Sequence, residues 1–331
     1  MYKDDRKFSI PFSYIVNPSE YLKMIHPYRK HIHSIFVGLP ELSTCVSNIS
    51  KKNIPNFEES AAKEFLELSK GLYKRFVPYN LVAYNVSDID VLKSFEKNVY
   101  PLIEQYEIDG FILTHFDLAR MIKRDFPKIE IHTSCNSYHW SVSTMEHWRN
   151  EIGVTLFNPP REAARTKGLL KALKNDGYQL KVLMNEACIY GCVYRYTANC
   201  GNCMKFDFIN GLRTNFILPR WMDELDECVD VYKLSGRMET LDKLKCIFDS
   251  YIFHKPFEYI NDIVVCKVIH PINILYHRYG IKIRESDLPQ KLLYCENKYC
   301  YKGCTECSTL YNKLIDKNLD LKKYDVLENI I

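Results

Sequence analysis

The feature that most constrains the fold is the alternation of short apolar runs with longer amphipathic stretches. Segments between the runs, such as 59–72, 117–124 and 162–174, have apolar residues at helical spacing. Strand and helix repeated in this order are typical of a parallel α/β sheet. The seven predicted strands are 34–38, 81–85, 110–114, 129–133, 154–158, 180–184 and 229–234.

Seven strand–helix units, one short of eight, favour a TIM-like (β/α)₈ barrel that is either complete or lacks one strand. A doubly wound open sheet is the alternative, but no glycine-rich phosphate-binding fingerprint follows any predicted strand. The closing strand is expected within 263–268 or near Tyr251. Because the pattern changes after residue 255, we divide the chain into a barrel domain (1–255) and a small cysteine-rich C-terminal extension (256–331).

The composition gives few hints about partners or location. The net charge of +4 is mildly basic, so an RNA substrate is allowed without being indicated. The N-terminal segment lacks the long apolar run of a secretory signal, and no run approaches the roughly 18 apolar residues of a membrane helix. We therefore expect a cytoplasmic protein with no membrane partner, whose thiols are free or bound to metal. The sequence does not specify an oligomeric state.

Eight of the thirteen cysteines fall into two short clusters. The first consists of Cys188, Cys192, Cys200 and Cys203, and the second of Cys295, Cys300, Cys304 and Cys307. Each cluster supplies four thiolates, enough for one Zn²⁺ or one iron–sulfur cluster. The spacing of the first cluster fits neither the usual zinc finger nor the bacterial ferredoxin run, so it indicates ligation without identifying the metal. Buried cysteines that act as small apolar residues are the alternative.

Polar residues gather where the predicted strands end, which is where the active site of a (β/α)₈ barrel forms. Histidine, carboxylate and thiol groups there are candidate catalytic groups; amide and cationic groups are suited to holding a substrate, because arginine grips carboxylates with two hydrogen bonds. A structural role is the alternative at each position. The catalytic candidates are His115, His132, Cys135 and Glu186. The substrate-binding candidates are Asn85, Asn136, Asn158, Asn185, Arg195, Lys233 and Arg237.

Four segments carry a resemblance to a known family. NEACIYGCVYR (185–195) and VDVYKLSGR (229–237), together with IEIHTSCN (129–136) and NPPREA (158–163), resemble the collagenase-like peptidase family U32 over about residues 30–255. The resemblance implies a barrel that binds a [4Fe–4S] cluster through four cysteines. Its better understood members resemble oxygen-independent hydroxylases of tRNA, ribosomal RNA or a quinone precursor, with prephenate implicated as the oxygen source.

The chain departs from this family pattern near the last predicted strand. Members with widely spread ligands take one cysteine from the segment that corresponds to 216–225, which here contains none. Cys200 and Cys203 look like local substitutes, and the second cysteine cluster lies outside the match. We therefore expect a [4Fe–4S] cluster at the first site and either iron–sulfur or zinc at the second.

These patterns lead to three functional hypotheses. The first is an iron–sulfur-dependent enzyme with redox or hydroxylation chemistry on an RNA nucleoside or a small aromatic substrate. The second is a peptidase, although Cys135 and His132 are three apart on a strand and so point to opposite faces, and no zinc-protease H-E-x-x-H motif is present. The third is a non-catalytic scaffold stabilised by zinc.

Overall fold

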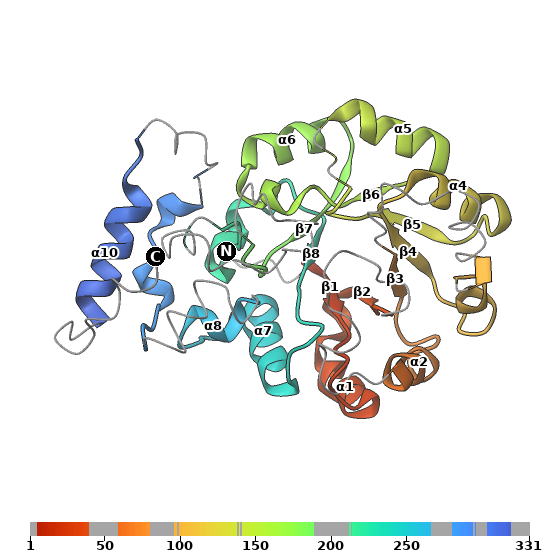
Figure 1. Cartoon of the computed structure of the whole chain (residues 1–331), viewed down its shortest axis with the longest axis horizontal. Helices are drawn as coiled ribbons and strands as arrows, with labels where there is room; N and C mark the ends of the chain where they lie inside the picture. Colours follow the sequence, from red (N-terminus) through yellow and green to blue (C-terminus); the bar gives the residue numbers. More distant parts are fainter. Residues whose placement is uncertain are drawn as a thin grey trace, which may run out of the picture.

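Eight parallel strands form a nearly closed barrel in this computed structural model (Figure 1). The structure describes residues 5–39, 59–79, 96–97, 99–137, 139, 141–188, 212, 214–265, 280–293, 295 and 303–318. The strands are β1 (Lys7–Pro11), β2 (Ile32–Phe36), β3 (Arg75–Tyr79), β4 (Gly110–Leu113), β5 (Glu130–Thr133), β6 (Leu156–Phe157), β7 (Gln179–Leu183) and β8 (Val231–Lys233).

The hydrogen-bonded strand order is β5-β4-β3-β2-β1-β8-β7-β6, so the N-terminal strand joins the two halves of the sheet. Its Ser9 pairs with Ser34 of β2 on one side and with Lys233 of β8 on the other. The end strands β5 and β6 also lie in contact. This arrangement confirms the predicted (β/α)₈ fold.

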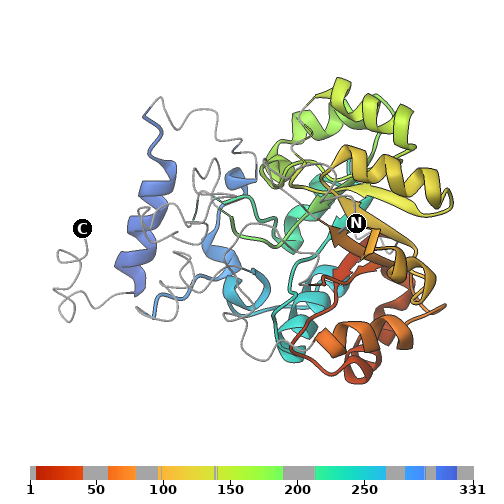
Figure 2. The same ribbon diagram turned by 45° about the vertical axis from the view of Figure 1, so that its right-hand side comes forward.

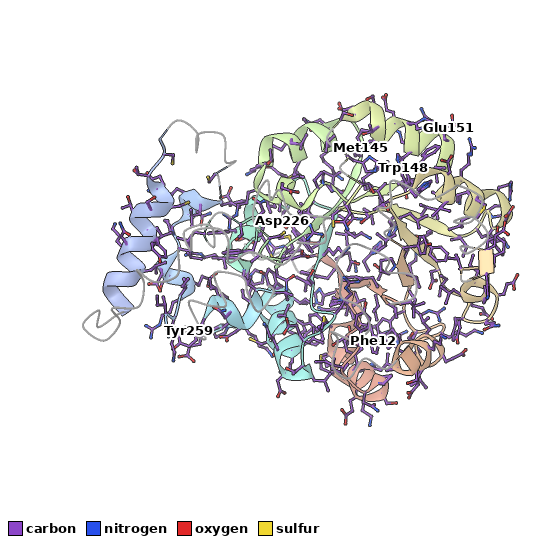
Figure 3. All side chains as sticks on the ribbon, viewed as in Figure 1. Phe12, Met145, Trp148, Glu151, Asp226 and Tyr259 are labelled. Carbon is purple, nitrogen blue, oxygen red and sulfur yellow. The ribbon has the colours of Figure 1, made fainter. Side chains whose placement is uncertain are left out.

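Helices cover the outer face of the barrel, as Figure 1 shows. They are α1 (Pro18–Ile25), α2 (Glu59–Leu68), α4 (Phe116–Asp125), α5 (Val142–Ile152), α6 (Lys167–Asn175) and α7 (Leu241–Phe253). In α5, Met145 and Trp148 face the sheet and Glu151 faces outward (Figure 3). This helix begins at Ser141, whose side chain accepts from the Thr144 N–H, and ends at Gly153, where φ is +77°.

The core has two parts. A large apolar cluster fills the space between the strands and the helices, and a small one, made of Phe36, Phe76 and Ile112, lies inside the barrel. These three residues come from β2, β3 and β4 and face inward, while their strand neighbours Ile35 and Phe111 join the outer cluster. The barrel interior is therefore partly apolar, and the charged groups described below sit beside this inner cluster.

Six of the eight strands lie where the sequence predicts them, and the closing strand does not. β1 closes the barrel, whereas Tyr251 lies in α7 and Ile263 ends the short helix α8 (Ile260–Ile263). Residues 266–268 of the proposed segment 263–268 lie outside the described residues. Val265, just after α8, makes a single parallel bridge with Glu186. The strand of the second predicted unit is β3, whereas the predicted range 81–85 lies outside the described residues.

The described part of the C-terminal extension packs beside the barrel, next to α7 (Figures 1 and 2). It contains α8, η7 (Glu285–Asp287), η8 (Gln290–Leu292) and α10 (Glu306–Asn318). Its apolar side chains, among them Ile281, Leu292 and Leu314, belong to the large cluster that also contains the barrel residues. The domain division at residue 255 stays a prediction. No helix in the described part of the chain has the length and apolar character needed to cross a bilayer.

Candidate active site at the barrel mouth

An ion pair between Arg161 and Glu186 is at the centre of the candidate site. Arg161 follows β6 and begins η3 (Arg161–Arg165), and Glu186 follows β7. The same guanidinium donates to Asn136 Oδ1 at 2.8 Å and lies 3.9 Å from Cys135 Sγ. Ser235, just after β8, donates to the second oxygen of Glu186 at 3.2 Å. The ends of β5, β6, β7 and β8 thus contribute to one polar network, as expected for the active-site end of a (β/α)₈ barrel.

Asn185 has a structural position beside this network. Its side chain is fully buried, donates to the carbonyls of Ser235 and Ile263, and accepts from the Ser235 N–H at 2.6 Å. Its own carbonyl accepts from Val265 N–H at 2.7 Å. All these bonds join β7, β8 and the segment after α8, so Asn185 holds the backbone that presents Glu186.

Two lysines point into the barrel from neighbouring strands. Lys181 of β7 is fully buried and Lys233, the last residue of β8, is 8 % exposed. Lys233 Nζ lies over the ring of Phe36, 4.7 Å from its centroid. Burial lowers the pKa of both amines, and in Lys233 the effect of burial is opposed by Cys135 and reinforced by Arg237. The candidate site therefore borders on a buried, positively charged interior.

His132 belongs to this interior. Its ring stacks on Phe76 at 4.1 Å between centroids, Nδ1 lies 2.9 Å from Lys181 Nζ, and Nε2 lies 3.7 Å from Glu130. Burial lowers the pKa of His132 to about 3, so the ring is neutral near pH 7. No hydrogen bond or ring contact joins His132 to Cys135 in the described part of the chain. The expectation that the two lie on opposite faces of one strand does not apply, because β5 ends at Thr133, before Cys135.

Two further candidates, Asn158 and His115, are positioned near the strand ends and keep buried polar atoms without a described partner. Asn158 is 1 % exposed, and both its side-chain amide and its backbone N–H donate to Thr133 at the end of β5. Its Oδ1 is buried and has no hydrogen-bond partner among the described residues. His115 precedes α4 without capping it, and its buried Nδ1 likewise has no described partner. These two groups retain unused polar atoms near the strand ends.

Arg237 closes the β8 side of the site. It donates to the Tyr14 hydroxyl at 3.3 Å, and Tyr14 lies in the loop after β1. Gly38 permits this approach, because a Cβ there would meet the Tyr14 hydroxyl at 1.9 Å and Arg237 at 3.0 Å. Tyr14 and Lys181 were not among the residues predicted from the sequence. A lysine within the apolar run LKVLM was the available signal for Lys181.

The first cysteine cluster is described only in part. Cys188 is half-buried, and its N–H donates to the Glu186 carbonyl at 3.2 Å. The first cysteine cluster therefore begins at the barrel mouth. The described residues include no group of three or more His, Cys, Asp or Glu side chains placed to hold a metal ion. Four members of the predicted site lie outside the described residues, namely Cys192, Arg195, Cys200 and Cys203, as does Asn85.

The second cluster lies at the contact between the extension and the barrel. Cys295 and Cys307 are half-buried, Cys304 is exposed, and Cys300 is outside the described residues. Arg165 is buried beneath them; both its Nε and Nη2 donate to the Phe216 carbonyl. Burial lowers the pKa of Arg165 to about 10, an effect that the nearby thiols of Cys295 and Cys307 oppose. Two thiols of this cluster thus approach one buried cation.

Comparison with known proteins agrees with this architecture. The chain is 24% identical to the uncharacterized protease MJ1657 of Methanocaldococcus jannaschii, over 91% of this chain and 94% of that protein. It is also 24% identical to the tRNA hydroxylation protein P of Haemophilus influenzae, over 64% of this chain and 44% of that protein. The solved U32 peptidase Mk0906 superimposes with a TM-score of 0.51 at 11% identity, covering 72% of this chain and 97% of that one, which supports the fold.

The model of peptidase family U32 matches residues 20–215, which is more than half of the chain. This range contains the strand ends that carry Cys135, Asn136, Arg161, Glu186 and Cys188. The chain therefore belongs to peptidase family U32.

Proposed function

We propose that this protein is a cytoplasmic iron–sulfur-dependent enzyme that performs redox or hydroxylation chemistry on an RNA nucleoside or a small aromatic substrate. The observation that carries the proposal is the network of Arg161, Glu186 and Ser235 at the barrel mouth. Glu186 lies two residues before Cys188 in the sequence, so the network adjoins the first cysteine of the cluster. A relative that is named as a tRNA hydroxylation protein supports the reaction class and the substrate class.

The donor set fits the proposed cofactor. Cys188, Cys192, Cys200 and Cys203 would hold the cluster, and thiolate sulfur is the usual ligand of iron in such centres. The half-buried position of Cys188 would place the cluster beside the polar network rather than on a remote surface. When bound, the cluster would supply electron transfer.

The remaining roles belong to the residues of the chain. Arg161 and Ser235 fix the two oxygens of Glu186, so this carboxylate is positioned to accept a proton from a substrate at the mouth. Arg237 provides positive charge for an anionic group such as a phosphate or carboxylate, and Lys233 borders the same position of the substrate. Arg195 would extend this charge on the side of the cysteine cluster.

The C-terminal cluster has a structural role in this proposal. Cys295, Cys300, Cys304 and Cys307 would bind zinc or a second iron–sulfur cluster. The contact of Cys307 with the large apolar cluster and the position of Cys295 near Arg165 support a metal knot that fastens the extension to the barrel.

Metal analysis under anaerobic conditions tests this assignment. The wild type should contain about four irons and sulfides at the first site and absorb near about 400 nm. Cys188→Ala should lose this absorbance, whereas Cys304→Ala should lose only the second metal. Cys228→Ala is the matched control, since that cysteine is buried in the large apolar cluster and should leave both metals in place. A colourless wild type with stoichiometric zinc would refute the proposal.

Peptide hydrolysis remains the alternative activity, because one relative is named as a protease. A cysteine protease requires a thiol beside a histidine. In the described part of the chain, the Cys135 thiol lies within hydrogen-bond reach of Asn136 and Arg161, and no histidine hydrogen-bonds to it. Hydrolysis of a peptide panel that is unchanged in Cys188→Ala would favour the peptidase.

A further inference from the structure

Lys233 is a buried amine with no polar partner among the described residues. Lys233 is 8 % exposed at the end of β8, and its side-chain amine forms no hydrogen bond or ion pair within the part of the chain that the structure describes. The ring of Phe36 covers one side of the amine. Burying an unpaired ammonium is costly, so such a group either loses its proton or meets an anionic ligand.

The surroundings of Lys233 also disfavour its charged form. Lys181 lies on the adjacent strand β7, and in the β7–β8 register it pairs with Val231, two residues deeper than Lys233. Arg237 and Arg161 add positive charge near the Lys233 amine at the mouth, and Lys233 in turn acts as a like charge on Lys181. Cys135 and Glu186 act in the opposite direction. A desolvated lysine beside other cations is the usual arrangement of a nucleophilic amine.

We propose that Lys233 is a nucleophile that forms an imine with the carbonyl group of an anionic carbonyl compound, with 2-oxo acids as the ligand class. The positive charge of Arg161 and Arg237 on the same side of the barrel selects for the carboxylate of such a ligand. This step uses only the side chains of the barrel, so it does not depend on the iron–sulfur proposal.

The chemistry balances without any redox partner. The nitrogen lone pair of neutral Lys233 attacks the carbonyl carbon, and the C=O π electrons move to the oxygen. The nitrogen gives up one proton and the oxygen takes one up, which yields a carbinolamine. Solvent water at the mouth can carry this proton from the nitrogen to the oxygen. The hydroxyl then leaves with a second proton as water, and a C=N bond remains.

Reductive trapping tests the proposal. The full-length protein, with its metals as purified, is incubated anaerobically with pyruvate and cyanoborohydride, which adds hydride to the imine carbon and fixes a carboxyethyl group on the amine. Peptide mapping by mass spectrometry then locates the adduct. Lys233 should be labelled at least about tenfold faster than Lys171, because each unit by which a pKa is lowered raises the neutral fraction about tenfold. Lys171 is an internal control, with an exposed side chain on α6.

Three comparisons decide the outcome. Lys233→Met should lose the fast adduct while Lys171→Met keeps it, and acetone, which lacks the carboxylate, should react more slowly than pyruvate. Mapping on the wild type remains decisive even if Lys233→Met fails to fold. Labelling of Lys233 no faster than of Lys171 would overturn the proposal, and equal rates with acetone would overturn the 2-oxo acid assignment. Fast labelling in Cys188→Ala would show that the amine acts without the cluster.

Discussion

Glu186 depends on two neighbours to hold its carboxylate at the mouth. Replacing Arg161 by Met leaves only Ser235, so a partly buried carboxylate loses its charged partner. We expect the free energy of unfolding to fall by about 1–3 kcal/mol and turnover to fall with it. Urea denaturation measures the first effect. Arg120→Met is the control, because its pair with Asp117 is mostly exposed and should contribute almost nothing. A variant of Arg161 that unfolds at the wild-type urea concentration would contradict the assignment.

A buried histidine near β6 makes stability depend on pH. His139 is 3 % exposed, packs edge-on against Trp148 and Phe157, and has its pKa lowered to about 4 by burial. Below pH 6.5 the unfolded chain binds a proton that the folded chain does not, so stability falls as the pH drops from 6.5 to 4. Between pH 7 and 5 this amounts to about 2 kcal/mol. His139→Phe should remove that part of the loss, and His26→Gln, at an exposed position, should not.

For single residues, the sequence predicted where a side chain lies in the barrel better than which other residues it contacts. The active site of a (β/α)₈ barrel forms where its strands end, and this expectation placed Glu186, Asn136 and Arg237 at the mouth because it needs only the order of the strands. It could not show that the buried His132 contacts Lys181 and Phe76, since those contacts depend on the register between distant strands. For the same reason the sequence could not show that Asn185 bonds to the backbone rather than to a ligand.

At the level of elements, proline obscured two strands. β1 ends at Pro11 and β3 contains Pro78, and proline within an apolar run argues against a central strand. The barrel tolerates both residues, although Pro78 pairs with Ile112 of β4. The strands without proline and with Val, Ile or Phe were located to within a few residues. The closing strand was sought at the wrong end of the chain because β1, which is short and ends in proline, was not recognised as a strand before α1.

The junction of β7, β8 and the segment after α8 depends on one side chain. Asn185→Asp keeps the shape of Asn185 but cannot donate to the carbonyls of Ser235 and Ile263. We expect a loss of about 2–4 kcal/mol in unfolding free energy, because two buried carbonyls and one charge lose their partners. Thermal melting and cluster content report the effect together. Asn175→Asp, at the exposed end of α6, should melt like the wild type; equal melting of both variants would show that the junction is held by other contacts.

At the scale of the whole molecule, the extension and the barrel share one core. Leu314 of α10 is 4 % exposed and belongs to the same apolar cluster as Ile252 and Ile263. If the extension from residue 256 folded independently of the barrel, Leu314→Ala would leave the barrel unaffected. We expect instead a single unfolding transition whose free energy is lowered by about 2–4 kcal/mol, as for other buried leucines.

Circular dichroism and tryptophan fluorescence should report this shift with coincident curves, since Trp148 and Trp221 lie in the barrel. The Lys313→Ala variant, at an exposed position, should unfold like the wild type. Two separated transitions, with only the first displaced by Leu314→Ala, would instead establish the boundary at residue 255.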